Sequence, residues 1–248
     1  IVASGLLVPA VFERLGPAGW PTGWLVLAVL AAVGTVAATI AAYAAPTTPA
    51  AAPGSRSFWV SGLGRLASGY LLFGAGYIGY MTFIIAMLTQ VGLSPKEIAA
   101  FWVALGVAGA VSGQVWARLL RGARGGSAAA VLFVLLAVAT GIPALTSATP
   151  ALYASGVLFG LCFLSLVGAV TAAGRDAVDP ADTTAALGML TTVFALGQVI
   201  GPWFTGLLAD RTGGQQWGLG VSAVVLLIGA VLCRLQPPRR IGHDAGAR

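Results

Sequence analysis

Aromatic rings and hydroxyl groups that could bind a small molecule are concentrated in one apolar segment, residues 66–89. The segment contains no Asp, Glu, Lys, Arg or His, yet Tyr70, Phe73, Tyr77 and Tyr80 recur in it at steps of three or four. This spacing places the four rings on one face of a helix. A hydroxyl without a partner in hydrocarbon costs on the order of a few kcal/mol. We therefore expect this face to lie against protein or a water-filled cavity.

Five aromatic or hydroxyl side chains are candidates for lining a substrate cavity. Rings would stack on an apolar or aromatic substrate, and hydroxyl groups would set its orientation. Aromatic packing inside a helical bundle is the alternative, and the sequence leaves it open. The candidates are Phe73, Tyr77, Tyr80, Thr82 and, from a later apolar segment, Trp102.

A polar stripe on a second segment supplies two further cavity candidates, Thr191 and Gln198. Together with Thr184 and Thr205 they recur at intervals of seven, so they share one helical face. An amide at mid-membrane depth is costly unless it has a partner. Gln198 either faces the cavity, where it hydrogen-bonds a substrate or a gating residue, or makes an interhelical hydrogen bond that only holds the bundle together. The sequence leaves both roles open.

The chain offers no set of catalytic or metal-binding residues. No Ser-His-Asp set, metal cluster or phosphate-binding loop is present, and the sole histidine, His243, lies near the C-terminus. No Asp, Glu, Lys, Arg or His lies in the middle of an apolar run. We therefore predict no enzyme activity, cofactor or metal. If transport is coupled to protons, we expect the titratable group outside these runs.

Composition predicts an all-α, polytopic membrane protein. Hydrophobic residues make up 58% of the chain and charged residues only 8%, whereas a soluble domain carries roughly a quarter charged residues. The apolar runs are continuous and of helix length, without the alternation of a membrane barrel. The net charge of +6 comes from residues in the short connections. It therefore indicates orientation in the lipid bilayer rather than binding to nucleic acid.

Eight apolar runs organise the chain. A Pro- and Ala-rich linker, 44–57, separates the second run from the third, and a polar tail covers 237–248. Ser94 is a predicted N-cap, with Pro95 at the first helical position and Glu97 in the first turn. The runs cover residues 1–12, 24–43, 58–89, 96–119, 127–145, 150–173, 183–209 and 217–235.

Basic residues divide unequally between the two ends of these runs, which predicts a cytoplasmic linker and C-terminus. Three lie at one end: Arg14, Lys96 and Arg211. Ten lie at the other: Arg56, Arg65, Arg118, Arg121, Arg124, Arg175, Arg234, Arg239, Arg240 and Arg248.

Two helices, a Pro-rich cytoplasmic linker and six further helices resemble the later part of a major facilitator superfamily (MFS) transporter. The segment FGAGYIGYMTF, residues 73–83, further resembles the uncharacterised YbfB-like branch. The resemblance implies that residues 1–43 are the last two helices of the N-terminal half and 58–236 the six-helix C-terminal half. It also implies a truncated first helix, so we expect the chain to be a fragment whose other N-terminal helices are missing.

The superfamily's loop signature, G-x-x-x-D-R-x-G-R-R, has a partial counterpart after the fourth run. Gly113, Arg118 and Arg121 match it, while Ala117 replaces the acid and Leu120 the second glycine. The antiporter signature G-x-x-x-G-P-x-x-G-G is not matched, because Gly5 and Pro9 are not adjacent. Pro202 frees a backbone carbonyl and can bend its helix, although packing is the alternative. The gate or loop candidates are Gly113, Arg118, Arg121, Arg175, Asp176 and Pro202.

The resemblance implies a secondary active transporter of a small organic solute, working by alternating access in the inner or plasma membrane. By position, runs three, four, six and seven would line the cavity, and the uniformly aliphatic runs five and eight would face lipid. The alternative is a receptor or scaffold that uses the same bundle without transport. The expected partners are the substrate, the lipid bilayer and the missing N-terminal half, and the expected oligomeric state is a monomer.

Overall fold

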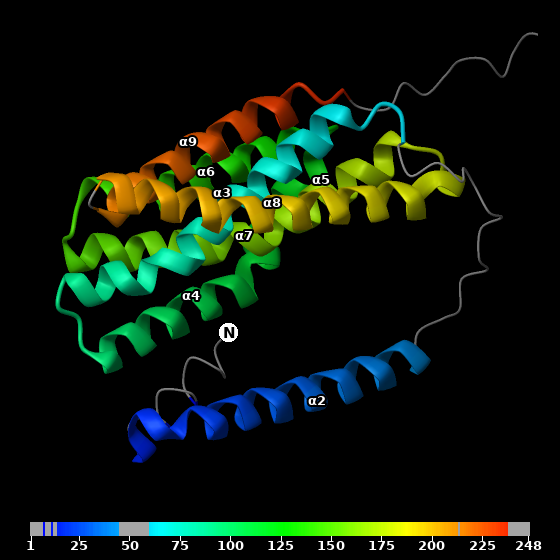
Figure 1. Ribbon diagram of the computed structural model, residues 1–248. Coiled ribbons are helices and arrows are strands. Elements are labelled where there is room, and N and C mark those ends of the chain that lie inside the picture. Colours follow the sequence, from blue (N-terminus) through cyan, green and yellow to red (C-terminus); the bar gives the residue numbers. More distant parts are fainter. Residues whose placement is uncertain (1–6, 8–10, 12–13, 45–59, 213, 238–248) are drawn as a thin grey trace, which may run out of the picture.

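The computed structural model describes residues 7, 11, 14–44, 60–212 and 214–237, and the regular structure in this part is entirely helical (Figure 1). Seven described helices are long and apolar enough to cross a membrane. The predicted all-α membrane fold is thereby confirmed. The long helices are α2 (Trp20–Ala44), α3 (Gly64–Gln90), α4 (Pro95–Val115), α6 (Ser127–Leu145), α7 (Thr149–Ala177), α8 (Thr183–Thr212) and α9 (Gln215–Arg234). The short elements are η1 (Gly16–Gly19), α5 (Ala117–Gly122) and η2 (Pro180–Asp182).

Most of the predicted first run, 1–12, lies outside the described residues, as do the linker from residue 45 onward and the tail from residue 238. In Figure 1, α2 lies apart from a bundle formed by the other long helices. The apolar side chains Val29, Val33, Val36 and Ile40 are exposed along it. These surfaces are available to lipid or to further helices.

Helices α3 and α8 are parallel neighbours that approach at backbone distance. A Cβ atom added to Gly197 would meet the carbonyl oxygen of Leu71, and one added to Gly201 would meet that of Ala75. The contacts therefore advance in the same direction along both helices. Glycine permits this approach, which supplies packing where burial from water provides no driving force.

A second parallel pair joins α4 to α7. Phe101 lies against Gly156, and the backbone of Leu105 lies against Gly160. Helices α6 and α9 instead run antiparallel and pack closely along their lengths. These three pairs are not consecutive in sequence, whereas α6 and α7, which are joined by a short connection, also pack against each other.

Three helix ends meet at the arginine-rich end of the bundle. The guanidinium of Arg65, at the start of α3, donates a 2.9 Å hydrogen bond to the carbonyl of Leu235, just after α9. The amide Nε2 of Gln236 donates to the carbonyl of Gly62 at 3.0 Å, and the carbonyl of Gln236 accepts from Gly126 N–H at 3.4 Å. The bond to Leu235 satisfies a carbonyl that the end of α9 leaves unpaired, and the three bonds together join the ends of α3, α6 and α9.

The fourth run is interrupted, which the sequence interpretation missed. Helix α4 ends at Val115, Trp116 takes φ −93° and ψ 4°, and α5 follows. The indole N–H of Trp116 donates a 2.8 Å hydrogen bond to the carbonyl of Leu161 in α7. This tertiary bond orients the side chain at the break.

The predicted start of α4 is confirmed. Ser94 N–H donates to Glu97 Oε2 at 2.8 Å, and Glu97 N–H donates to Ser94 Oγ at 3.4 Å, with Pro95 in the first turn. This reciprocal capping box satisfies two backbone donors.

Candidate functional site

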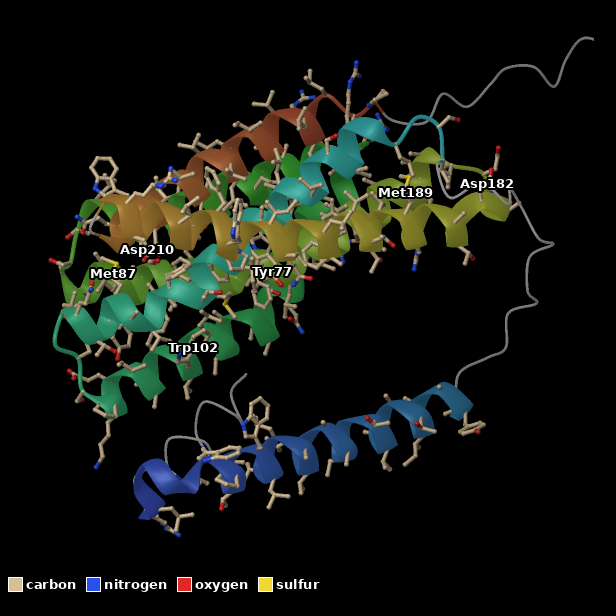
Figure 2. All side chains as sticks on the ribbon, viewed as in Figure 1. Tyr77, Met87, Trp102, Asp182, Met189 and Asp210 are labelled. Carbon is tan, nitrogen blue, oxygen red and sulfur yellow. The ribbon has the colours of Figure 1, made fainter. Side chains whose placement is uncertain are left out.

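A hydrogen bond between α3 and α8 defines the centre of the candidate site. Gln198 Nε2 donates to the hydroxyl of Tyr77 over 2.5 Å, and both side chains are half-buried. Tyr77 is the central residue of α3, and Gln198 is central in α8. In Figure 2, Tyr77 lies in the middle of the bundle, between Met87 and Asp210 toward one end and Met189 and Asp182 toward the other. The pair therefore lies near the midplane of the predicted spans.

An aromatic cluster surrounds the Tyr77 ring. Phe73 stacks on it with ring centroids 4.9 Å apart, and Phe194 of α8 lies 5.6 Å away at an interplanar angle of 13°. Phe163, the central residue of α7, is parallel to the Tyr77 ring within 10°, at 6.4 Å. Offset stacking of this kind is favourable for aromatic rings. Three helices thus contribute to one aromatic surface.

The Tyr77–Gln198 hydrogen bond lies where the backbones of α3 and α8 approach each other closely. A Cβ atom at Gly74 would meet the carbonyl of Phe194 and lie near the backbone nitrogen of Gln198. The opposing glycines Gly197 and Gly201 have G-x-x-x-G spacing, a motif that favours close helix packing. The sequence interpretation did not use this spacing, although it was available.

Pro202 contributes to the same site through the backbone. It lies inside α8 and has no N–H, so it cannot donate the helical hydrogen bond to the carbonyl of Gln198. Gln198 therefore combines a side-chain amide with a backbone carbonyl that lacks its usual helical donor.

Tyr80 and Phe73 lie inside the packed bundle and have no exposed surface. The Tyr80 hydroxyl is 2.8 Å from Ser155 Oγ, and Ser155 Oγ donates to the carbonyl of Ala139 at 2.7 Å. Because Ser155 has one hydroxyl proton, Tyr80 must be the donor to Ser155. Pro143 explains the network. It lies inside α6 and has no N–H, so it leaves the Ala139 carbonyl without its helical donor, and Ser155 donates to that carbonyl instead. The sequence interpretation missed both Ser155 and Pro143.

Three other cavity candidates are not brought to Tyr77. Thr82 is exposed and lies five residues beyond Tyr77, which places it about 140° around α3. Thr191 is exposed, and its hydroxyl donates to the carbonyl of Leu187 in its own helix. Trp102 is half-buried on α4, edge-on to Phe101 with ring centroids 6.0 Å apart. Substrate contact by these residues stays a prediction.

The gate and loop candidates other than Pro202 are exposed near the arginine-rich end. A Cβ atom at Gly113 would meet open space. Within the part of the chain that the structure describes, Arg118 and Arg121 form no ion pair, and neither do Arg175 and Asp176. Their role in gating stays a prediction. The same part contains no cluster of three or more His, Cys, Asp or Glu side chains able to hold a metal.

Comparison with known proteins agrees with this architecture. The family model described as uncharacterised MFS-type transporter YbfB matches residues 1–234, almost the whole chain. No curated protein matches the chain. The predicted resemblance is therefore confirmed. The family consists of multi-pass membrane transporters and not of enzymes, as the sequence predicted. The chain belongs to the family described as uncharacterised MFS-type transporter YbfB.

Proposed function

We propose that this protein is a secondary active transporter that moves a small, neutral organic solute with a planar or aromatic group. The observation that carries the proposal is the Tyr77–Gln198 hydrogen bond at mid-depth in an aromatic cluster. Transporter sites lie near the bilayer midplane, where a few polar groups orient a largely apolar ligand.

The chemistry of the pair supports a hydrogen-bonding ring as the substrate. The aromatic surface of Tyr77 and Phe163 would stack on a planar group. The backbone carbonyl of Gln198 would accept a hydrogen bond from the substrate, because Pro202 cannot donate the usual helical hydrogen bond to it. No acidic or basic side chain lies in the middle of α3, α7 or α8, so these three helices supply no counter-charge, and a neutral solute suits the surface that they form.

We further propose that α3 to α9 form the C-terminal half of the transporter, with α2 ending the N-terminal half. The exposed apolar faces of α2 are consistent with packing against further helices. Alternating access would then be a rocking of the two halves about the Tyr77–Gln198 level. The hydrogen bond from Arg65 to Leu235 supports one common, arginine-rich end, which we assign to the cytoplasmic side of the inner or plasma membrane.

Uptake into proteoliposomes that contain the full-length transporter, with its N-terminal half, tests this function. Uridine and the phenyl glucoside salicin are suitable probes because both are neutral, planar at one end and poorly permeable through lipid. We expect uptake of at least one of them and none of glutamate. Tyr77→Ala and Gln198→Ala should each reduce uptake at least tenfold while the protein remains folded. Normal uptake by both variants would exclude this site, and uptake of glutamate alone would exclude the neutral substrate class.

A further inference from the structure

A surface groove between α6 and α9 is distinct from the Tyr77 site. It has a volume of about 410 Å³, within the range of roughly 300–1,000 Å³ that is usual for ligand sites. Its walls are Ala130, Val131 and Val134 of α6, with Ala230, Val231 and Leu235 from α9 and its end. Ser127 and Arg234 complete the lining.

The exposed faces beside the groove are suited to hydrocarbon. On α6 the exposed side chains before the last residue are valines three or four residues apart, and on α9 they are aliphatic from Val224 to Val231. In a membrane protein, a continuous aliphatic face of this kind lies against lipid chains. The exposed residues are Val131, Val134, Val138, Val224, Leu227, Ile228 and Val231.

Positive charge lies at one end of the groove only. Arg234 is the exposed last residue of α9, and exposed Arg124 is joined by hydrogen bonds of its backbone to the Ser127 hydroxyl. Within the described residues, neither guanidinium has an acidic partner. Arg65 lies at the same end, where it bonds the carbonyl of Leu235. Guanidinium groups bind phosphate by paired, charge-assisted hydrogen bonds.

The dimensions match one leaflet of a bilayer. From Ser127 to Val134 the groove extends over seven residues of α6, or about 10 Å at the rise of an α-helix. One leaflet of the hydrocarbon core is about 15 Å thick, half of roughly 30 Å. A molecule with its phosphate at the arginines therefore has most of a leaflet's depth available for an acyl chain.

We propose that this groove is a binding site for an anionic phospholipid. The headgroup phosphate binds Arg124 and Arg234, and one acyl chain lies between Val131 and Val134 of α6 and Val231 of α9. Charge complementarity selects an anionic headgroup, because no acidic side chain lines the groove. The apolar walls select a lipid over free phosphate, which would leave them without a partner. The groove shares no lining residue with the Tyr77 cluster.

Thermal unfolding of the purified protein in detergent tests the proposal, with phosphatidylglycerol and phosphatidylcholine titrated separately. A ligand that binds only the folded state raises Tm in a concentration-dependent way. We expect phosphatidylglycerol to raise Tm more than phosphatidylcholine, and native mass spectrometry to detect it bound. Arg234→Gln should weaken the apparent affinity about fivefold, the effect of one basic residue near an anionic headgroup. Val134→Trp, which fills the groove, should abolish the shift.

Matched controls lie outside the groove. Arg211→Gln removes an exposed arginine from the last turn of α8, and Val224→Trp enlarges an exposed valine of α9. Both should keep the full response to phosphatidylglycerol. Equal protection by phosphatidylcholine, or an unchanged response in Arg234→Gln and Val134→Trp, would overturn the proposal. Equal protection by soluble glycerophosphate would indicate an anion site instead. A dimer that Val134→Trp dissociates would indicate an interface between copies.

Discussion

The side-chain amide of Gln198 donates a 2.5 Å hydrogen bond to the hydroxyl of Tyr77, a residue 121 positions away. The bond exists because two parallel helices, α3 and α8, touch through glycines on either side of it. It joins the midpoints of both helices and lies inside a stack of aromatic rings. The same glycine contacts that pack α3 against α8 therefore also set the geometry of the candidate site.

Gly197→Ala is expected to destabilise the protein, because the new methyl group would collide with the carbonyl of Leu71. Overpacking of this kind costs roughly 1–3 kcal/mol. Gly188→Ala is the matched control, since its Cβ would meet open space in the same helix. Alanine favours a helix over glycine by about 1 kcal/mol, so the control should hold or raise Tm. Thermal unfolding in detergent measures both, and equal effects would contradict the close approach.

A double-mutant cycle with Tyr77→Phe and Gln198→Met should measure the interhelical hydrogen bond directly. The expected coupling energy is about 0.5–1.5 kcal/mol in the free energy of unfolding, typical of a net protein hydrogen bond. Tyr77→Phe with Thr191→Val is the control cycle, because the Thr191 hydroxyl bonds its own helix. That cycle should be additive within about 0.5 kcal/mol. Additivity in both cycles would argue against the bond.

Ser155→Ala should destabilise the bundle, since it leaves the Ala139 carbonyl and the Tyr80 hydroxyl without partners. The expected loss is roughly 1–3 kcal/mol in the free energy of unfolding. Adding Pro143→Ala should recover part of that loss, because alanine restores the N–H that donates to Ala139 within α6. Such a rescue distinguishes the network from simple loss of packing.

Ser112→Ala is the control for this experiment. Ser112 is also buried, but its hydroxyl donates to the carbonyl of Gly109 in its own helix. Its replacement should change the free energy of unfolding by less than Ser155→Ala does. If Pro143→Ala fails to improve the stability of Ser155→Ala, the proline does not explain the network.

Cysteine labelling should reveal the orientation of the bundle. Gly122→Cys lies exposed at the arginine-rich end, and Ser147→Cys lies exposed between α6 and α7 at the opposite end. A membrane-impermeant maleimide should label Gly122→Cys only from the cytoplasmic side and Ser147→Cys only from outside. The unaltered protein is the blank, because Cys162 and Cys233 are both buried. The reverse pattern would show an inverted protein.

Local patterns in the sequence were sufficient for the seven spans that the structure describes and for part of their boundaries. Helix α6 begins and ends where the fifth apolar run does, and the Ser94–Glu97 capping box forms as predicted. Both follow from interactions within a few residues, namely hydropathy and N-terminal capping. Family membership also followed from the order of the spans and the segment 73–83, and the match over residues 1–234 agrees.

Long-range contacts required the tertiary structure. At the break after α4, Trp116 donates a hydrogen bond to Leu161 of α7. Ser155 bonds the Ala139 carbonyl, which Pro143 of α6 leaves without a helical donor. The polar stripe lies on one helix as predicted, yet the Gln198 amide bonds to α3 whereas the Thr191 hydroxyl bonds within α8. In lipid, helix partners are chosen by close packing and polar contacts rather than by hydrophobicity. Hydropathy therefore determined which segments cross the membrane, and the fit of glycines such as Gly74 and Gly197 decided which faces meet.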